Sequence, residues 1–293
     1  MPRKSDPKER ERATIASRKR GKNFRSQRGC DDSGRSFRSL AVRSNSPEVN
    51  TGGMCERFAL DEKTKDLISL FVADGNDYQD WVPSFSVAPT DPVPIIRERR
   101  NKDTGEVRRT IDAAIWNFHP SFMKDAKRPQ FNSRIETVAT NGLWKGAFAS
   151  SRCIVPMRGY YEWTERDDQG KTVKIPHFIH SPERVLAAAG IWTARKIAEE
   201  WEVSASIITR EARDASGELH DRMPVFLQPE VFDRWLDTEK LADDAQKADM
   251  LAMLDHVSAE VASTITTYGV DRKVNNSRTV DPTDGSLIAP VQS

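Results

Sequence analysis

The sequence predicts an α+β protein, with one folded domain built on a curved, barrel-like mixed β-sheet flanked by helices. Several short segments rich in β-branched or aromatic residues indicate strands, and helical patterns lie before and after them. The two kinds of segment do not alternate in a βαβ rhythm, which argues against a doubly wound parallel sheet. With 293 residues, of which 37% are hydrophobic, the chain can bury a sizeable core.

The charge of the chain changes sign near residue 53. Overall, 45 Lys and Arg stand against 44 Asp and Glu, for a net charge of +1. Residues 1–53 carry 14 basic and 6 acidic residues, a net charge of +8, which leaves 31 basic and 38 acidic residues, a net charge of −7, in residues 54–293. We therefore predict two regions: a basic, disordered N-terminal extension over residues 1–53 and a folded domain over residues 54–293.

The extension has no apolar core of the length a secretory signal needs, and no later segment is apolar enough to span a membrane. A cytoplasmic location is expected. The three cysteines, at positions 30, 55 and 153, form neither a metal-ligand spacing nor an even disulfide framework. We expect no metal, no cofactor and a monomeric chain.

The expected elements follow in chain order. Asp61–Val72 is predicted to be a helix, because Leu67, Leu70 and Phe71 share one face and acidic residues stand at its start. Helices are also predicted near the end of the chain, at Pro229–Leu236 and Ala242–Leu254. The predicted strands are Ser84–Ala88, Val93–Arg97, Ala113–Phe118, Cys153–Tyr161, Lys174–His180, Val185–Ile191 and Ala205–Thr209.

Several short segments carry reactive side chains beside arginines. They are Met54–Phe58, Asn132–Thr137, Arg152–Trp163 and His220–Val225. Cys55, Asn132, Glu162 and His220 supply a thiol, an amide, a carboxylate and an imidazole. Such a set could form a reactive site beside an anion-binding surface.

Each of these residues also has a simpler interpretation. A lone cysteine such as Cys55 at a domain edge is more often inert than nucleophilic. Glu162 could be a solvated strand residue or an ion-pair partner, although strand alternation places it on the face opposite Tyr161 and Trp163. His220 could belong to a plain turn, and Asn132 to an ordinary loop. Taken singly, these residues do not establish a site.

Taken together and in order, the segments resemble the SOS-response-associated peptidase (SRAP) family of abasic-site-processing proteins. That family shows Met-Cys-Gly-Arg-Phe at its start, then N-x-A-P, a W-G segment ending in Pro, N-A-R-x-E-T, an R-C segment ending in Glu-Trp, and H-D-R-M-P. The resemblance covers about residues 54–291. The matching stretches are Met54–Phe58, Ser86–Pro89, Trp116–Pro120, Asn132–Thr137, Arg152–Trp163, His220–Pro224 and Val274–Asn276.

The resemblance implies an SRAP-like fold and covalent capture of abasic sites in single-stranded DNA. An opened abasic sugar is an aldehyde, and only an N-terminal cysteine offers an amine and a thiol on adjacent carbons to close a thiazolidine ring on it. The family's label also implies a self-cleaving or peptidase activity. Internal Cys55 has an amide in place of the amine. We therefore expect either that translation starts at Met54 or that the extension is cut off after Met54, and we favour the internal start.

Residue roles carry over from the family motif by motif. Cys55 is the expected nucleophile, Glu162 the general acid–base, His220 the acid that opens the sugar, and Asn132 the group that holds the amine and the linked sugar. The expected DNA contacts are Arg57, Arg134 and Arg222 on phosphates and Phe122 as an aromatic platform for a base.

Two departures from the family pattern replace a glycine with a larger side chain. Glu56 replaces the glycine after the cysteine and adds a negative charge beside it, and Asn117 replaces the glycine of the W-G segment. Two other functions stay open. One is a thiol peptidase using Cys55 with His220, and the other is a non-catalytic module that binds single-stranded DNA.

Overall fold

The structure is a computed structural model that describes residues 28–30, 36–38, 55–76, 78–124, 128–212 and 219–291. Two short strands, β1 (Arg28–Cys30) and β2 (Ser36–Arg38), are all that it describes of the predicted extension. The prediction that residues 1–53 are disordered otherwise falls outside the described residues and stays a prediction.

Five strands close into a mixed β-barrel. Around the ring the order is β13, β12, β9, β6 and β7, with antiparallel pairing between these neighbours. A parallel pairing of β13 with β7, at Ser204 and Ile115, completes the ring. The predicted barrel-like mixed sheet is therefore confirmed. The bounds are β6 (Pro92–Arg100), β7 (Val107–Ile115), β9 (Arg152–Met157), β12 (Leu186–Ile197) and β13 (Glu200–Glu211).

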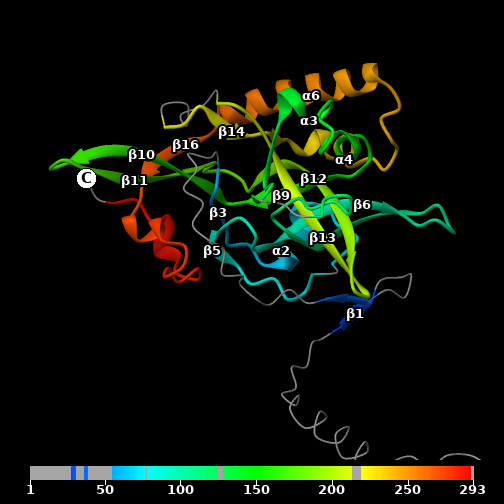
Figure 1. The fold of residues 1–293 in the computed structure, drawn as a ribbon, viewed down its shortest axis with the longest axis horizontal. Helices are drawn as coiled ribbons and strands as arrows, with labels where there is room; N and C mark the ends of the chain where they lie inside the picture. The colour runs from blue at the N-terminus through cyan, green and yellow to red at the C-terminus, as the bar shows by residue number, and fades with distance from the viewer. Residues whose placement is uncertain are drawn as a thin grey trace, which may run out of the picture.

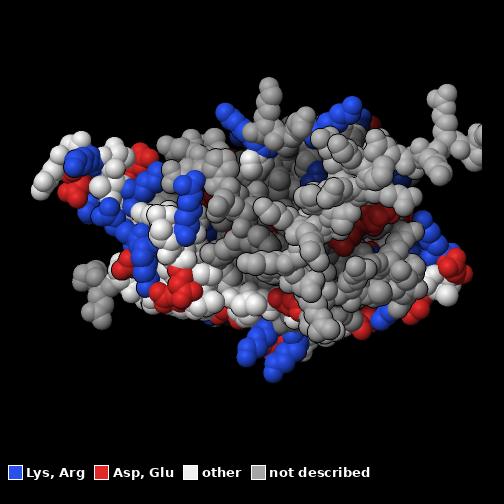
Figure 2. Space-filling view, turned by 60° about the horizontal axis from the view of Figure 1, so that its bottom comes forward, with Lys and Arg blue, Asp and Glu red and all other residues white. Residues whose placement is uncertain are grey.

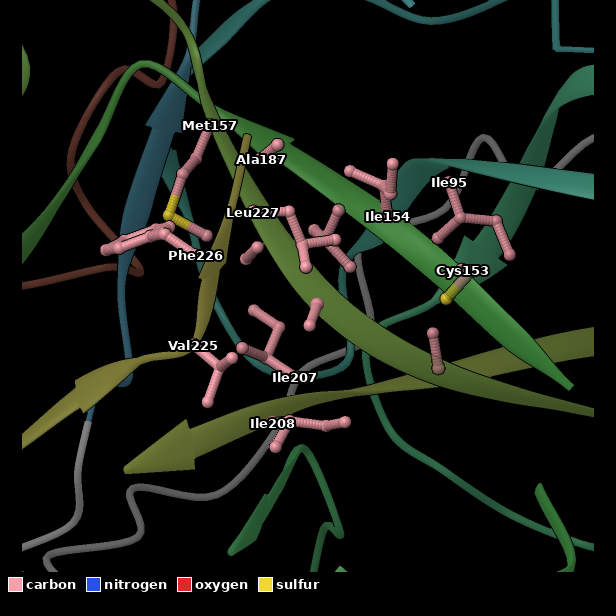
Figure 3. Close-up of a cluster of buried hydrophobic side chains, with 14 of the residues drawn as sticks. Ile95, Cys153, Ile154, Met157, Ala187, Ile207, Ile208, Val225, Phe226 and Leu227 are labelled. Carbon is pink, nitrogen blue, oxygen red and sulfur yellow. The ribbon is translucent and has the colours of Figure 1, made fainter. Parts of the chain in front are cut away.

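Shorter strands extend the barrel at its rims. β8 (Asn132–Arg134) and β14 (Arg222–Pro224) both pair with β13, β15 (Phe226–Leu227) pairs with β12, and β4 (Gly75–Asn76) pairs with β7. Figure 3 shows apolar side chains from several of these strands packed together, including Ile154 of β9, Ile207 of β13 and Phe226 of β15. Burial of such side chains supplies the main favourable free energy of folding.

A second, antiparallel sheet lies beside the barrel. Its order is β16, β11, β10, β3 and β5. The bounds are β3 (Phe58–Leu60), β5 (Ser84–Val87), β10 (Gly159–Asp168), β11 (Lys171–His180) and β16 (Thr266–Gly269). Strands β10 and β11 form a long hairpin that projects from one end of the molecule (Figure 1). Because β3 follows Cys55 and β10 carries Glu162, this sheet brings two predicted site residues together.

Helices are few and lie outside the barrel. They are α2 (Thr64–Leu70), α3 (Ile135–Val138), α4 (Lys145–Ser150), α5 (Phe232–Leu236) and α6 (Asp244–Ala262), with 3₁₀ turns η2 (Pro229–Val231), η3 (Arg272–Asn275) and η4 (Gly285–Ile288). The long α6 runs along one side of the molecule in Figure 1 and begins at Asp243, whose carboxylate accepts a hydrogen bond from the Gln246 backbone. None of the helices in the described ranges has the length and apolar composition to cross a membrane.

The predicted elements are confirmed in type, with two errors of extent. The strand predicted at Ala113–Phe118 runs from Val107 to Ile115. The expected helices are present, although α6 ends later than predicted. The single strand predicted at Cys153–Tyr161 is wrong, because the chain leaves the barrel after Met157 and enters the second sheet at Gly159. Arg158 stands at this crossing and donates its backbone N–H to Ala59 O at 2.7 Å. Arg158 and Gly159 interrupt the apolar run at the break, and this was the signal in the sequence that the prediction passed over.

Candidate functional site

Cys55, Asn132 and Glu162 meet at the junction of the two sheets. The backbone nitrogen of Cys55 donates a hydrogen bond to Glu162 Oε1 at 2.8 Å, and Asn132 Nδ2 donates to Cys55 O at 3.4 Å. Cys55 is fully buried, and Glu162 is 2% exposed. Three residues separated by 30 to 107 positions in the sequence are thus in direct contact, and the nitrogen of residue 55 faces the carboxylate.

Strand alternation explains why Glu162 points into the molecule. Tyr161 belongs to a small apolar cluster on the outer face of the second sheet, and Trp163 packs against that cluster. Tyr160, which precedes them on the strand, lies in the main core. The predicted opposition of Glu162 to the two aromatics is therefore confirmed.

Burial sets the protonation of both reactive groups. Burial raises the pKa of Glu162 to about 8. The hydrogen bond from the Cys55 backbone lowers this pKa, whereas the charges of Glu56 and Asp221 raise it. Burial also raises the pKa of the Cys55 thiol well above its ordinary value, and the nearby charges of Glu162 and Glu56 add to the effect. At neutral pH the site therefore favours a carboxylic acid and a neutral thiol.

The backbone of Cys55 is strained. Its φ is 36°, in the left-handed region that costs a non-glycine residue roughly 1–2 kcal/mol. The contacts with Glu162 and Asn132 hold the residue in this conformation. The neighbouring Glu56, which departs from the family motif, is only partly buried and adds negative charge to the site.

His220 lies on a loop that leads into β14. Its Nδ1 accepts a hydrogen bond from the backbone nitrogen of Arg222 at 3.1 Å and lies 3.1 Å from Asp221 Oδ1. The charge of Asp221 adds to the rise in the pKa of Glu162. The contacts of His220 are with its own loop.

The predicted DNA-contacting residues differ in their surroundings. Arg134 is exposed, and Phe122 is 69% exposed on a turn held by a hydrogen bond from Met123 N to Pro120 O. Arg57 is 8% exposed, and its Nη1 donates to Ser86 Oγ and Val274 O. Phe122 and Arg134 are therefore accessible to a ligand, whereas Arg57 ties the start of the domain to its C-terminal part.

Arg222 is also mostly buried, at 9% exposure. Its guanidinium makes a two-pronged contact with the carboxylate of Glu136 and a hydrogen bond with Thr209 O at 2.8 Å. Sequence reasoning missed Glu136 and Asp221 as members of the site. Both stand inside the motif segments, so the sequence signal for them was their position close to Asn132 and His220 along the chain.

Basic side chains gather at one end of the face in Figure 2, where the β10–β11 hairpin and the C-terminal turns lie. On the hairpin, the register sets Lys174 opposite Glu165 and Lys171 opposite Asp168. These lysines therefore face acidic neighbours across the strands. Among the described residues, no group of three or more His, Cys, Asp or Glu is placed to hold a metal ion.

A family model described as "SOS response associated peptidase (SRAP)" matches residues 54–277. This chain is a member of the SRAP family. The matched range begins at Met54, one residue before the buried Cys55, and includes every site residue described above. The match confirms the family that the motif segments predict.

Several members of the SRAP family are similar to most of the domain. The abasic site processing protein YoaM of Bacillus subtilis is 31% identical over 206 residues, covering 65% of this chain and 82% of the relative. YedK of Escherichia coli, an abasic site processing protein, is 28% identical over 201 residues, with 66% and 84% covered. HMCES of Xenopus tropicalis, of the same description, is 26% identical over 239 residues, covering 71% of this chain and 66% of the relative.

Two crystal structures share the fold seen here. A protein from Bacteroides thetaiotaomicron matches with a TM-score of 0.61 at 19% identity, covering 81% of this chain and all of that one. A phage-related protein from Bordetella bronchiseptica matches with a TM-score of 0.55 at 24% identity, covering 74% of this chain and 95% of that one. These likenesses support the fold of the barrel and the second sheet.

Proposed function

We propose that this chain, with Cys55 as its N-terminal residue, captures abasic sites in single-stranded DNA through a covalent thiazolidine crosslink. The observation that carries the proposal is the 2.8 Å contact between the Cys55 nitrogen and the Glu162 carboxylate. It sets the nitrogen that would become the α-amine against a buried proton donor and acceptor. The description of the relatives as abasic site processing proteins supports the same substrate.

The chemistry balances without a cofactor. The α-amine of Cys55 attacks C1′ of the open-chain aldehyde to give a carbinolamine, which loses water and becomes a Schiff base. The thiol then adds to the imine carbon and its proton passes to the imine nitrogen, closing the five-membered ring. The aldehyde and the aminothiol together give one thiazolidine and one water molecule.

Glu162 suits the proton transfers of this sequence. In the chain that continues upstream of Cys55 burial raises the pKa of Glu162 to about 8, and a buried carboxyl of this kind can hold a proton and pass it to the departing hydroxyl of the carbinolamine. Once ionised, the same carboxylate can accept the proton that the thiol releases during ring closure. Asn132, hydrogen-bonded to Cys55 O, would hold residue 55 in place while its nitrogen reacts.

The environment of the thiol favours this reaction over thiol proteolysis. A cysteine peptidase needs a thiolate, whereas burial and nearby carboxylates raise the pKa of the Cys55 thiol. In the proposed route the amine attacks first and the thiol adds as a neutral group whose proton is transferred within the site. His220 is assigned the protonation of the ring oxygen that opens the sugar.

Two accessible residues are the expected DNA contacts. Phe122 is exposed enough to stack on a base, and Arg134 to bind a flanking phosphate. These contacts would hold a strand on a domain whose net charge is −7. The assignment of Arg57 and Arg222 to phosphate binding rests on the family motifs in which they stand.

The proposal requires a free amine at residue 55. We favour translation from Met54 followed by removal of that methionine, with cleavage of a longer chain as the other route. Measurement of the intact mass of the protein made from its native upstream sequence separates the two. A mature protein that still carries residues 1–53 and crosslinks normally would refute the thiazolidine route.

A crosslinking assay tests the function. A chain beginning at Cys55 is mixed with an oligonucleotide containing one abasic site, and a heat-stable shifted band is expected in a denaturing gel. Cys55→Ala and acylation of the α-amine should each abolish the band. A mechanism that uses the Cys55 thiol without the amine, as in a thiol peptidase, predicts that acylation leaves activity intact, so loss of the band with the thiol still free excludes it. Absence of a band from the unmodified chain refutes the proposal.

A further inference from the structure

Two of the motif segments flank the same strand of the barrel. β8, which begins at Asn132, pairs with β13 in parallel, and β14, which follows His220, pairs with β13 in antiparallel. Thr209 of β13 is a partner of both, opposite Arg134 on one side and Pro224 on the other. A strand residue has one ladder edge on each side, so the two segments lie on opposite edges of β13.

One side-chain pair bridges the two segments across this strand. Glu136 lies in α3, directly after β8, and Arg222 is the first residue of β14. Arg222 Nη1 donates to Glu136 Oε1, and Nη2 donates to Glu136 Oε2 at 2.9 Å. Two parallel hydrogen bonds between a guanidinium and a carboxylate fix the relative orientation of the groups as well as their distance.

The same arginine also sets the orientation of the histidine. The Arg222 backbone N–H donates to His220 Nδ1 at 3.1 Å, which holds the imidazole against the start of β14. Because Nη2 of Arg222 also donates to Thr209 O at 2.8 Å, the whole residue is anchored on β13. Movement of Arg222 would therefore move or release the imidazole.

We propose that Glu136 is a positioning residue of the crosslinking reaction, which holds His220 in register with Asn132 by binding Arg222 across β13. The proposal rests on the proposed function. It makes Arg222 a structural link to the histidine in addition to any phosphate contact. Glu136 itself reaches no reacting atom and acts through the Arg222 backbone.

The test compares Glu136→Ala and Glu136→Gln with the unaltered chain beginning at Cys55. The rate constant for crosslinking is measured at saturating abasic DNA, and affinity is measured separately with a stable tetrahydrofuran analogue of the abasic site. We expect Glu136→Ala to lower the rate constant by about 10- to 100-fold, the order that misplacement of a catalytic group produces. Affinity for the analogue should change less than the rate. Glu136→Gln retains one acceptor oxygen for Arg222, so its rate constant should lie between those of the unaltered chain and Glu136→Ala.

Asp255→Ala provides a matched control. Asp255 pairs with Arg210, a buried arginine of the same strand β13, at 2.7 Å, but the pair joins β13 to α6 instead of to the His220 loop. Removal of this partner should leave the crosslinking rate within about twofold of the parent's, as expected for a contact away from the site. An equal loss in Asp255→Ala and Glu136→Ala would overturn the proposal, because the effect would then be general weakening of the strand.

A double-substitution experiment tests the route through the histidine. If Glu136 acts through His220, then Glu136→Ala should lower the rate much less in a His220→Ala background than in the parent chain. A full additional loss in that background contradicts the proposal. So do unchanged NMR chemical shifts of the His220 imidazole in Glu136→Ala. Absence of crosslinking by the parent chain would instead count against the proposed function.

Discussion

The buried carboxyl of Glu162 predicts an unusual dependence of stability on pH. In the folded chain its pKa is about 8, whereas an unfolded glutamate has an ordinary value of 4.5. The folded state therefore holds this proton more tightly than the unfolded state does. Its contribution to stability is fully present below pH 4.5 and is lost as the pH rises to 8, because the unfolded chain ionises there while the folded chain does not.

The size of the effect follows from the two pKa values. At about 1.36 kcal/mol for each factor of ten in proton affinity, the whole window corresponds to about 5 kcal/mol, and the part between about pH 5 and pH 8 to about 4 kcal/mol. This is a large share of the roughly 5–15 kcal/mol by which a domain is folded. Glu162→Gln keeps the acceptor for the Cys55 N–H and removes the titration.

Urea unfolding of both proteins at about pH 5 and pH 8 measures the effect. We expect the unfolding free energy of Glu162→Gln, relative to the parent, to rise by about 4 kcal/mol between the two pH values. Glu165→Gln, at an exposed position of the same strand, is the control and should change the free energy by less than about 0.5 kcal/mol. A difference between Glu162→Gln and parent that varies by less than about 1 kcal/mol would refute the reasoning.

The same measurement distinguishes a chain that continues upstream of Cys55 from a chain that begins at Cys55. The experiment above uses a chain that continues upstream of Cys55, so an amide faces Glu162. In a chain that begins at Cys55, an ammonium takes the place of the amide and favours the carboxylate. The pH dependence should then shrink. An equal dependence in both chains would mean that the α-amine does not approach Glu162.

Three further substitutions test the packing and the ligand surface. Arg152→Ala should lower the unfolding free energy by at least about 3 kcal/mol in urea, because its buried guanidinium donates to backbone carbonyls at the ends of α4 and α5, which would lose their partners. Gly159→Ala should lower the unfolding free energy by about 1–3 kcal/mol or more, since the new Cβ would lie 2.5 Å from Ile179 O. In the control Gly146→Ala, the new Cβ meets nothing within 4 Å, so the unfolding free energy should stay the same or rise. Phe122→Ala should leave the melting temperature unchanged, as expected for a 69% exposed side chain, and weaken binding of abasic single strands by about 1–3 kcal/mol in a titration.

Local patterns carried most of the fold because each depends on near neighbours in the sequence. The strand at β5 and the helix at α2 arise from runs of apolar residues with a clear period, and their positions match the prediction closely. The break at Arg158 escaped prediction, because Arg158 and Gly159 mark an irregularity but do not show that β9 pairs in the barrel and β10 in the second sheet. The three-residue β8 is a strand because β13 offers it a ladder edge.

The site divides in the same way between sequence and structure. Motif wording identified Cys55, Asn132, Glu162 and His220 as candidates, since side-chain chemistry and order along the chain are properties of the sequence. It assigned Arg222 to phosphate binding, although an arginine beside a histidine can bind a carboxylate equally well. Only the folding of α3 and β14 around β13 brings Glu136 to that arginine.

The sequence by itself determined the family and named the candidate reactive groups, because these follow from residue type and order. The tertiary structure alone decided that the nitrogen of Cys55 faces Glu162, that both are buried, and that the carboxyl is therefore mostly protonated near neutral pH. Burial and distance depend on strands that meet from remote parts of the chain. Proton affinity depends on burial and distance, and so does the chemistry available to the site.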